Sequence, residues 1–230
     1  MTVGALLLAA GAGERLARDR PKALCEVGGR TLLEHSLSAL RAHPSIGAIV
    51  VTAPADHAQR IVELTAGDPF VTVISGGRTR QDSVRLGLGV LAEEADVVLV
   101  HDAARPFITG ACIDRVLAAL EAGADAAVPA VPVTDTIKRI AADGAVVGTV
   151  DRGELRAVQT PQGFRRTALA AAHQFARMAN LHDVSDDAGL IERHGGRVVV
   201  VDGDAEAFKI TRPLDLALAE LTLRSMQSRP

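Results

Sequence analysis

Cysteine is scarce in this sequence, which holds only Cys25 and Cys112 among 230 residues. The two residues have no metal-ligand spacing and suggest no disulfide framework, so we expect both to be reduced thiols. An excess of positive charge is also missing, because the formal net charge at pH 7 is −3. This balance gives no basic surface for nucleic acid or for a membrane, and any anionic substrate must meet a local cluster of cations.

The apolar run at the start of the chain is too short to cross a bilayer. It extends over Val3–Ala10, has no charged segment before it and leads directly into glycines. These features argue against a secretion signal and favour a buried strand. Internal repeats, low-complexity tracts and long linkers are absent as well. We therefore expect a cytoplasmic protein with no nucleic-acid partner and no membrane partner.

The pattern of apolar residues predicts the fold class. The 230 residues fit a single domain, and 48% of them are hydrophobic, enough for a sizeable core. Short apolar runs occur at Val3–Leu8, Ala48–Ala53, Phe70–Ser75, Val97–Val100, Ala126–Val131 and Arg197–Val201. Amphipathic stretches lie at Thr31–Ala42, Ala55–Thr65, Asp82–Glu94, Gly110–Glu121, Arg166–Met178 and Leu214–Met226. Strands that are apolar throughout indicate a parallel sheet with helices on both faces, that is, a Rossmann-like, doubly wound α/β domain.

Residues 134–159 depart from this alternation. Two β-prone runs flank Asp143-Gly144, a pair typical of a tight turn, and together they predict a hairpin. The hairpin is inserted between a core strand and the next helix, so we expect it to project as an arm. A two-stranded ribbon is marginal by itself, and we expect this one to pack on a partner subunit in a homodimer. A hairpin folded back on its own domain is the alternative.

The loop after the first run is rich in small residues: Ala9, Ala10, Gly11, Ala12 and Gly13. Four cations follow within eight residues: Arg15, Arg18, Arg20 and Lys22. Small residues at a strand end let backbone N–H groups approach a phosphate or a base, and ligands bind beyond the carboxyl ends of such strands. A dinucleotide fingerprint would place a glycine where Leu16 stands, and a Walker loop would need Gly-Lys-Ser/Thr. A triphosphate loop of another kind remains, beside the plainer alternative of a tight turn with solvated basic residues.

Two further strand ends carry polar residues. Gly76 and Gly77 make a tight turn, and Asp82 or Ser83 can cap the helix that follows. In the segment after the fourth run, His101 and Asp102 are neighbours on a strand and point to opposite faces, so we interpret His101 as structural. Asp102 can hold Mg²⁺ directly or through water, and Arg105 can bind a phosphate or hold Asp102. Lys209 lies between two apolar residues, a pattern that by itself is typical of a solvated lysine on an edge strand. Three acids lie near the start of a helix, and we interpret them as caps and solvated charges: Asp183, Asp186 and Asp187.

Taken together, these segments resemble a known family. Leu-Ala-Ala-Gly-Ala-Gly-Glu-Arg-Leu with a following Arg-Pro-Lys resembles the signature of the sugar-phosphate nucleotidyltransferases. His-Asp-Ala-Ala-Arg-Pro, Thr-Val-Asp-Arg, Thr-Pro-Gln and Lys-Ile-Thr-Arg-Pro then follow in order. Over essentially its whole length the chain resembles the 2-C-methyl-D-erythritol 4-phosphate cytidylyltransferases. The resemblance implies transfer of CMP from CTP to that polyol phosphate, with Mg²⁺ or another divalent cation, in non-mevalonate isoprenoid precursor synthesis.

The resemblance also implies roles for individual residues. Arg15 and Lys22 would stabilise the triphosphate in the transition state, while Lys209 and Arg152 would position the acceptor phosphate, Arg152 from the partner subunit. The residues expected around the cytidine are Ala9, Ala10, Gly11, Gly76, Gly77, Arg78, Ser83 and Ala103. Those expected around the acceptor are Asp102, Arg105, Thr136 and Thr160. Glu14 and Arg78 depart from what is usual in the family, and we expect no fused cyclodiphosphate synthase domain.

The chemistry implied by the resemblance needs cations rather than a general base. A phosphate monoester oxygen, already anionic near neutral pH, attacks the α-phosphorus of CTP and displaces pyrophosphate. The obstacle is repulsion between two polyanions, so the enzyme acts by positioning and by neutralising charge. Three alternatives stay open: a cytidylyltransferase for another polyol phosphate such as ribitol 5-phosphate, an inactive nucleotide-binding protein, and a dinucleotide-dependent dehydrogenase.

Overall fold

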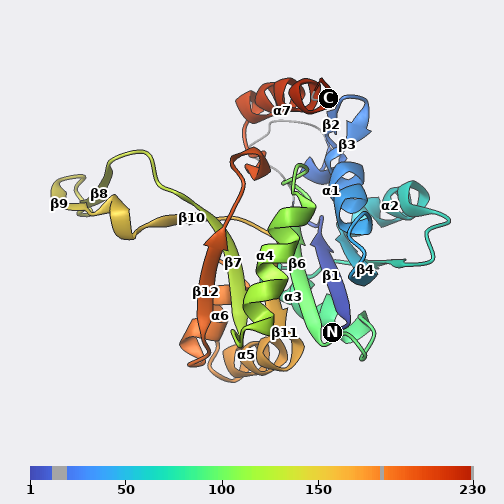
Figure 1. Cartoon of the computed structure of the whole chain (residues 1–230), viewed down its shortest axis with the longest axis horizontal. Helices are drawn as coiled ribbons and strands as arrows, with labels where there is room; N and C mark the ends of the chain where they lie inside the picture. Colours follow the sequence, from blue (N-terminus) through green and yellow to red (C-terminus); the bar gives the residue numbers. More distant parts are fainter. Residues whose placement is uncertain (12–19, 182–183, 229–230) are drawn as a thin grey trace.

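The computed structural model describes residues 1–11, 20–181 and 184–228 of the chain. They form a sheet of eight strands with helices on both faces, and a hairpin that stands away from this body (Figure 1). Along the sheet the strands follow the order β10 (Arg156–Val158), β7 (Ala126–Pro132), β11 (Gln162–Arg165), β6 (Val97–Asp102), β1 (Val3–Leu8), β4 (Ile46–Ala53) and β5 (Val71–Ser75). A further strand, β12 (Val198–Asp202), pairs with β7.

Most of the sheet is parallel. Strand β1 lies between β4 and β6 and is parallel to both, and β5 extends the parallel order beyond β4. Strand β12 is parallel to β7. Strand β11 is antiparallel to its two neighbours, β6 and β7, and β10 is antiparallel to β7. The predicted doubly wound, mostly parallel sheet is therefore confirmed, with two short antiparallel strands added to it.

The helices form a layer on each face. One face is covered by α1 (Leu32–Arg41), α2 (Ala58–Thr65) and α4 (Gly110–Glu121), and all their buried leucines and isoleucines except Leu32 belong to one core cluster. The other face is covered by α3 (Arg80–Val90), α5 (Arg166–Met178) and α6 (Asp187–Arg193) around a second cluster. The amphipathic stretches predicted five of these six helices, all but α6, and they gave α4 and α5 with their observed bounds.

The end of the chain packs on a small hairpin near its start. Helix α7 (Pro213–Gln227) lies over β2 (Glu26–Val27) and β3 (Arg30–Thr31), as the top of Figure 1 shows. A third core cluster fills the space between them, with Phe107 and Ile210 among its buried members. Pro213 takes the first helical position, where its missing N–H costs nothing. This packing fixes the segment that carries Lys209.

Side-chain caps fix where the helices begin. The hydroxyl of Thr31 accepts from the N–H of Glu34 at the start of α1, and the Glu34 carboxylate accepts from the N–H of Thr31 in return. Thr79 caps α3 by accepting from the N–H of Asp82, so the expectation that Asp82 or Ser83 is the cap was wrong. The 3-10 helix η3 (Ala55–His57) precedes α2 and divides the helix predicted there.

The predicted hairpin consists of β8 (Ile137–Ile140) and β9 (Val146–Val150), which form a sheet of their own. It projects from the body at the left of Figure 1, with Gly144 at φ 85° in its turn. At the far end of the predicted arm, β10 returns to the main sheet, so only part of residues 134–159 projects. The projecting part, which we call the arm, exposes several large apolar side chains: Ile140, Val146 and Val147 are 62–63% exposed.

No helix within residues 1–11, 20–181 and 184–228 is both long and apolar enough to span a membrane.

Candidate active site

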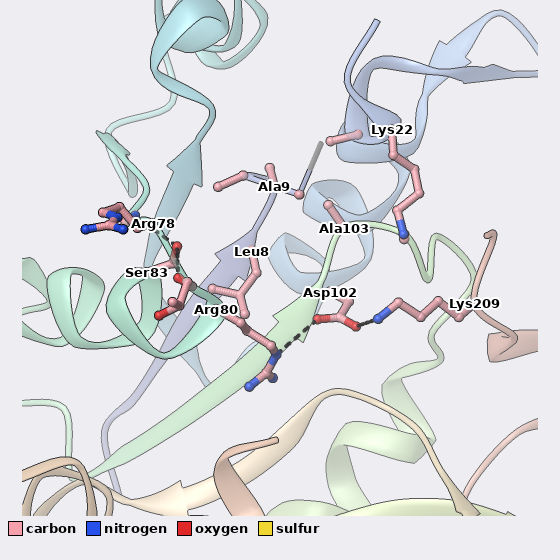
Figure 2. A pocket seen from close by; sticks show the side chains of 15 residues that line it. Leu8, Ala9, Lys22, Arg78, Arg80, Ser83, Asp102, Ala103 and Lys209 are labelled. Atoms are coloured by element: carbon pink, nitrogen blue, oxygen red, sulfur yellow. Dashed lines mark hydrogen bonds and ion pairs between the residues drawn. The ribbon is translucent and has the colours of Figure 1, made fainter. Parts of the chain in front are cut away.

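A pocket of about 360 Å³ opens at the carboxyl ends of β1, β5 and β6. This volume lies within the roughly 300–1,000 Å³ of small-molecule sites. Figure 2 shows Arg78 and Ser83 on one side of it and Lys22 and Lys209 on the other. The described residues that line it are Leu8, Ala9, Ala10, Gly11, Lys22, Ala23, Gly77, Arg78, Thr79, Arg80, Ser83, Asp102, Ala103, Ala104 and Lys209. The pocket lies where a doubly wound sheet binds its ligands.

The loop after β1 brings backbone and one cation to the pocket. The N–H of Ala9 donates to the carbonyl of Thr52 at 2.9 Å, which continues the pairing of β1 with β4 past the end of β1. Gly11 follows at the pocket wall. Arg15, predicted to contact the triphosphate, lies outside the described residues. Lys22 lines the pocket from the short 3-10 helix η2 (Lys22–Leu24).

Glycines let the loop after β5 pass close to the loop after β1. A Cβ atom on Gly76 would lie 2.4 Å from the Cβ of Ala10. The N–H of Gly77 donates to the Ser83 hydroxyl at 3.0 Å, and that hydroxyl donates to the carbonyl of Thr79 at 3.0 Å. Gly76 is thus needed for the close approach of the two loops, while Ser83 both braces the turn and lines the pocket.

Asp102 ends β6 between two cations (Figure 2). Its Oδ2 accepts from the Lys209 ammonium at 2.5 Å, and its Oδ1 lies 3.8 Å from the Nε of Arg80. Burial by itself would raise the pKa of Asp102, but Lys209 and Arg80 outweigh burial and lower this pKa to about 2. Asp102 is therefore an anion at neutral pH, and it links a lysine from before α7 to an arginine on α3.

Arg80 is held in turn by a buried acid. Its Nη1 donates to Oδ2 of Asp187, whose other oxygen accepts from Nε2 of His173 at 2.9 Å. The Asp187 side chain is 0% exposed. Burial would raise its pKa, but the charge of Arg80 and the hydrogen bond from His173 lower it below the usual value. The interpretation of Asp187 as a solvated charge was wrong, because the packing of α6 against α3 and α5 encloses it.

Of the two other acids near the start of α6, Asp186 caps the helix. Asp186 is the N-cap of α6, and its Oδ1 accepts from the N–H of Gly189 at 3.0 Å. Its Oδ2 accepts from the Gln162 amide at 2.7 Å. Asp183 lies outside the described residues. The two adjacent aspartates therefore have different roles: Asp186 caps α6, and Asp187 binds the Arg80 guanidinium.

His101 and Thr160 support Asp102 from behind. The hydroxyl of Thr160 accepts from the N–H of Asp102 at 3.1 Å and lies 2.9 Å from Nδ1 of His101. Nε2 of His101 lies 3.1 Å from the carbonyl of Arg105, which can only accept, so Nε2 carries the proton and Nδ1 accepts from Thr160. Burial lowers the pKa of His101 to about 4. The ring is neutral and structural, as its position on the strand indicates.

Four residues expected around the acceptor or in the partner's site do not line this pocket: Thr160, which is buried beside His101 as described above, and Arg105, Thr136 and Arg152. Arg105 donates to the carbonyls of Ala207 and Val158 at 2.9 and 3.1 Å, so it ties the approach to Lys209 to β10. Thr136 is exposed just before β8. Arg152 is exposed in the 3-10 helix η4 (Arg152–Glu154) at the base of the arm, where it donates to a backbone carbonyl.

The two important residues that sequence reasoning missed are Arg80 and Asp187. Arg80 lies three positions after Gly77, in a motif that the sequence analysis had singled out. This closeness to the glycines was the signal that could have identified it. Asp187 had no local signal, because its partner lies 107 residues away in the chain. The other lining residues that were not predicted have small or apolar side chains and form part of the pocket wall: Leu8, Ala23, Thr79 and Ala104.

The charges of the pocket suit phosphate groups. The described lining contains four cations and one acid: Lys22, Arg78, Arg80, Lys209 and Asp102. That lining includes neither histidine nor cysteine, so it offers charge rather than a general base. Within the described residues no three acidic, histidine or cysteine side chains gather as a metal site. Asp102 would have to leave Lys209 to bind a metal directly, so the geometry fits a contact through water better.

Comparison with known proteins gives one consistent result. The model of the family described as IspD, 2-C-methyl-D-erythritol 4-phosphate cytidylyltransferase, matches residues 3–225. A curated protein of that name from Frankia casuarinae is 48% identical over 96% of this chain and 81% of its own length. Another from Rhodococcus jostii is 48% identical over 94% of this chain and 93% of its own. The crystal structure of the Thermus thermophilus protein of that name is 39% identical, covers 97% of this chain and 100% of its own, and superposes with a TM-score of 0.78.

Proposed function

The chain belongs to the 2-C-methyl-D-erythritol 4-phosphate cytidylyltransferase family, and on that premise we propose how its residues carry out the reaction. The reaction transfers CMP from CTP to 2-C-methyl-D-erythritol 4-phosphate and releases pyrophosphate, in isoprenoid precursor synthesis. The observation that carries the assignment of residues is the pocket at the strand ends, where backbone-rich loops meet Lys22 and Lys209. No residue there needs to remove a proton, because the attacking phosphate oxygen is already an anion.

Lys22 acts on the nucleotide side. It follows the loop after β1, whose small residues form the wall at which CTP would lie. An ammonium in this position offsets the negative charge that develops on the departing pyrophosphate as its bond to the α-phosphorus breaks. Loss of one such donor costs about 10²–10³ in rate by analogy with an oxyanion hole. Arg15, from the undescribed part of the same loop, is proposed to share this role.

Lys209 acts on the acceptor side. The Lys209 ammonium has three N–H donors, and it donates one hydrogen bond to Asp102 at 2.5 Å, which orients the group toward the pocket. The remaining hydrogens can donate to the acceptor phosphate and hold one of its oxygens near the α-phosphorus. Alignment of two bound reactants supplies much of the rate in such transfers, because their translational and rotational freedom is already lost.

A second subunit is proposed to complete the acceptor site. Arg152 does not line the pocket of its own chain among the described residues, and it lies at the base of the projecting arm. The exposed Ile140, Val146 and Val147 on the arm need apolar cover, which a second copy of the chain would provide. We therefore propose a homodimer in which Arg152 contacts the acceptor phosphate in the partner's pocket.

Mg²⁺, or another divalent cation, is proposed to accompany the nucleotide. Mg²⁺ prefers phosphate oxygens and waters and uses few protein ligands in such sites. Asp102, the acid of the pocket, would meet it through water. The ion would neutralise triphosphate charge that Lys22 cannot reach. A cytoplasmic location is also proposed, and the two buried cysteines, Cys25 and Cys112, fit it because neither is in a disulfide.

The direct test is pyrophosphate release from CTP, ATP, GTP and UTP, each with methylerythritol phosphate and with ribitol phosphate. We expect strong preference for CTP, because backbone at Ala9, Ala10 and Gly77 forms a narrow wall that suits a pyrimidine edge. Equal kcat/KM for ATP would contradict this account of the wall. A higher kcat/KM with ribitol phosphate would instead redirect the acceptor assignment while leaving the nucleotide side in place.

A further inference from the structure

Alternating charges run from the interior of the domain to the pocket. In order they are Asp187 on α6, Arg80 on α3, Asp102 at the end of β6 and Lys209 before α7. His173 on α5 contacts the inner end of this row through Asp187. Figure 2 shows the outer half, with Asp102 between Arg80 and Lys209. Four separate elements thus meet in one row of charges that ends at the proposed acceptor cation.

Stability alone does not account for the inner end of the row. Removing a carboxylate from water costs several kcal/mol, roughly what its attraction to a buried partner returns, so a buried ion pair seldom adds net stability. Apolar side chains of similar size would fill the site of Asp187 at less cost. A fully buried aspartate is better explained by the geometry that it imposes on its partner, Arg80.

Arg80 connects Asp187 to Asp102, so the position of Asp187 affects the position of Asp102. Its Nη1 is bound to Asp187, while its Nε lies 3.8 Å from Asp102. The guanidinium is planar and rigid, so fixing one edge fixes the direction of the other. Without this second cation, Asp102 would depend on Lys209 alone for its charge, and Lys209 would be drawn toward Asp102 and away from a substrate.

We propose that Arg80 and Asp187, backed by His173, are positioning residues for the transfer. They fix the Asp102 carboxylate and, through it, the direction of the Lys209 ammonium in the pocket. Neither Asp187 nor His173 lines the pocket with the described residues, and both act through Arg80. The proposal rests on the role assigned above to Lys209 in binding the acceptor phosphate.

The experiment measures KM for each substrate and kcat in Asp187→Asn, with Lys209→Met in parallel. Asp187→Asn should raise KM for the acceptor about 10- to 100-fold, by analogy with the loss of a residue that orients a metal ligand. KM for CTP should stay within about twofold, because the nucleotide side does not depend on this row. If Lys209→Met raises the acceptor KM but Asp187→Asn does not, the inference is overturned and the role of Lys209 stands. An unchanged acceptor KM in Lys209→Met would overturn both.

The matched control is Asp186→Asn, which removes a carboxylate one position away. Asparagine still caps α6, and Gln162, whose buried amide oxygen has no partner among the described residues, can turn its amide to meet the new side chain. The acceptor KM of this variant should stay at the wild-type value. An equal rise in both variants would assign the effect to a displaced α6 and overturn the proposal.

A double variant covers the case in which Asp187→Asn folds poorly. Arg80→Met with Asp187→Asn removes both charges of the buried pair, which is far milder for folding than leaving one of them unpaired. Its acceptor KM should match that of Arg80→Met alone, because both changes break the same row. A folded double variant with the wild-type acceptor KM, or with effects that multiply, would overturn the proposal.

Discussion

At the scale of single residues, His101 makes the stability of the folded chain depend on pH. It is fully buried, accepts from Thr160 and donates to the carbonyl of Arg105. Because its pKa is lowered to about 4 in the folded chain, the unfolded chain binds its proton first as the pH falls from about 6.5. The stability that this neutral ring contributes is therefore complete above pH 6.5 and is lost progressively between about pH 6.5 and 4.

Replacing His101 by Gln should weaken the response of stability to acid. Gln offers a donor and an acceptor but does not titrate, so the free energy of unfolding lost between pH 7 and pH 5 should shrink by about 2 kcal/mol. Urea denaturation at both pH values, at one protein concentration, measures this difference. His194→Gln, at an exposed position, is the matched control. A His101→Gln variant that loses as much free energy as the wild type would show that this ring is not the titrating group.

Residues of the site were predictable where a short motif carried them. Asp102 and Lys209 belong to segments that the resemblance singled out, and both line the pocket. The contact between Arg80 and Asp187 was not predictable, because it joins residues 107 positions apart and depends on how α6 packs. An aspartate at a helix start looks the same in a sequence whether it meets water or a buried guanidinium.

At the scale of elements, two glycines in α3 should respond to alanine in opposite ways. Gly89 is exposed with nothing within 4 Å of an added Cβ, whereas a Cβ on Gly87 would lie 2.9 Å from Cδ2 of the buried Leu6. Gly89→Ala should stabilise the chain by about 0.5–1 kcal/mol through helix propensity. Gly87→Ala should destabilise it by about 1–3 kcal/mol, because α3 must move away from β1.

Urea denaturation of the two variants measures both effects against the wild type. The pair serves as its own control, since both changes add one methyl group to the same helix. Equal shifts of the same sign would contradict the close approach of α3 to β1. That approach matters for the site, because α3 carries Arg80 and Ser83.

Elements were predictable in proportion to the length of their apolar pattern. Helices α4 and α5 have 12 and 13 residues with clear amphipathic spacing, and the pattern gave their bounds. Strand β11 is only Gln-Gly-Phe-Arg, and one of its four residues is apolar and large. It is a strand because β6 and β7 present their edges to it, and its Gly163 is needed because a Cβ would lie 2.4 Å from Val116 of α4. That reason is tertiary and leaves no local pattern.

At the scale of the whole molecule, the homodimer proposed above would make activity a property of paired chains. Lys22→Ala and Arg152→Ala should each inactivate the homodimer, the first through the nucleotide and the second through the acceptor. If Arg152 acts in the partner's pocket, a mixed dimer holds one site with both changes and one with neither. Mixing the two inactive variants under subunit exchange should therefore restore up to about a quarter of wild-type activity, since about half of the dimers are mixed.

Formation of mixed dimers is checked with two differently tagged chains. Each variant mixed with itself is the control and should stay inactive. Proven mixed dimers without recovered activity would place Arg152 in the site of its own chain. Recovery would also explain why the pocket of one chain has no acceptor cation from the arm among its described lining residues.

The position of β11 also governs the order in which the chain can fold as it is synthesised. Once residues 1–102 have been made, the four neighbouring parallel strands β5, β4, β1 and β6 can pair with one another, while the other edge of β6 still lacks β11. Strand β7 emerges next but touches β6 only through β11, which arrives after the arm has been translated. Until Gln162–Arg165 inserts, the nascent chain exposes β6 as an open apolar edge, a surface on which other chains can pair. The loops after β1 and β5 that line the pocket can thus form well before Lys209 is made, and throughout that interval until β11 is in place the nascent chain is open to wrong pairing along β6.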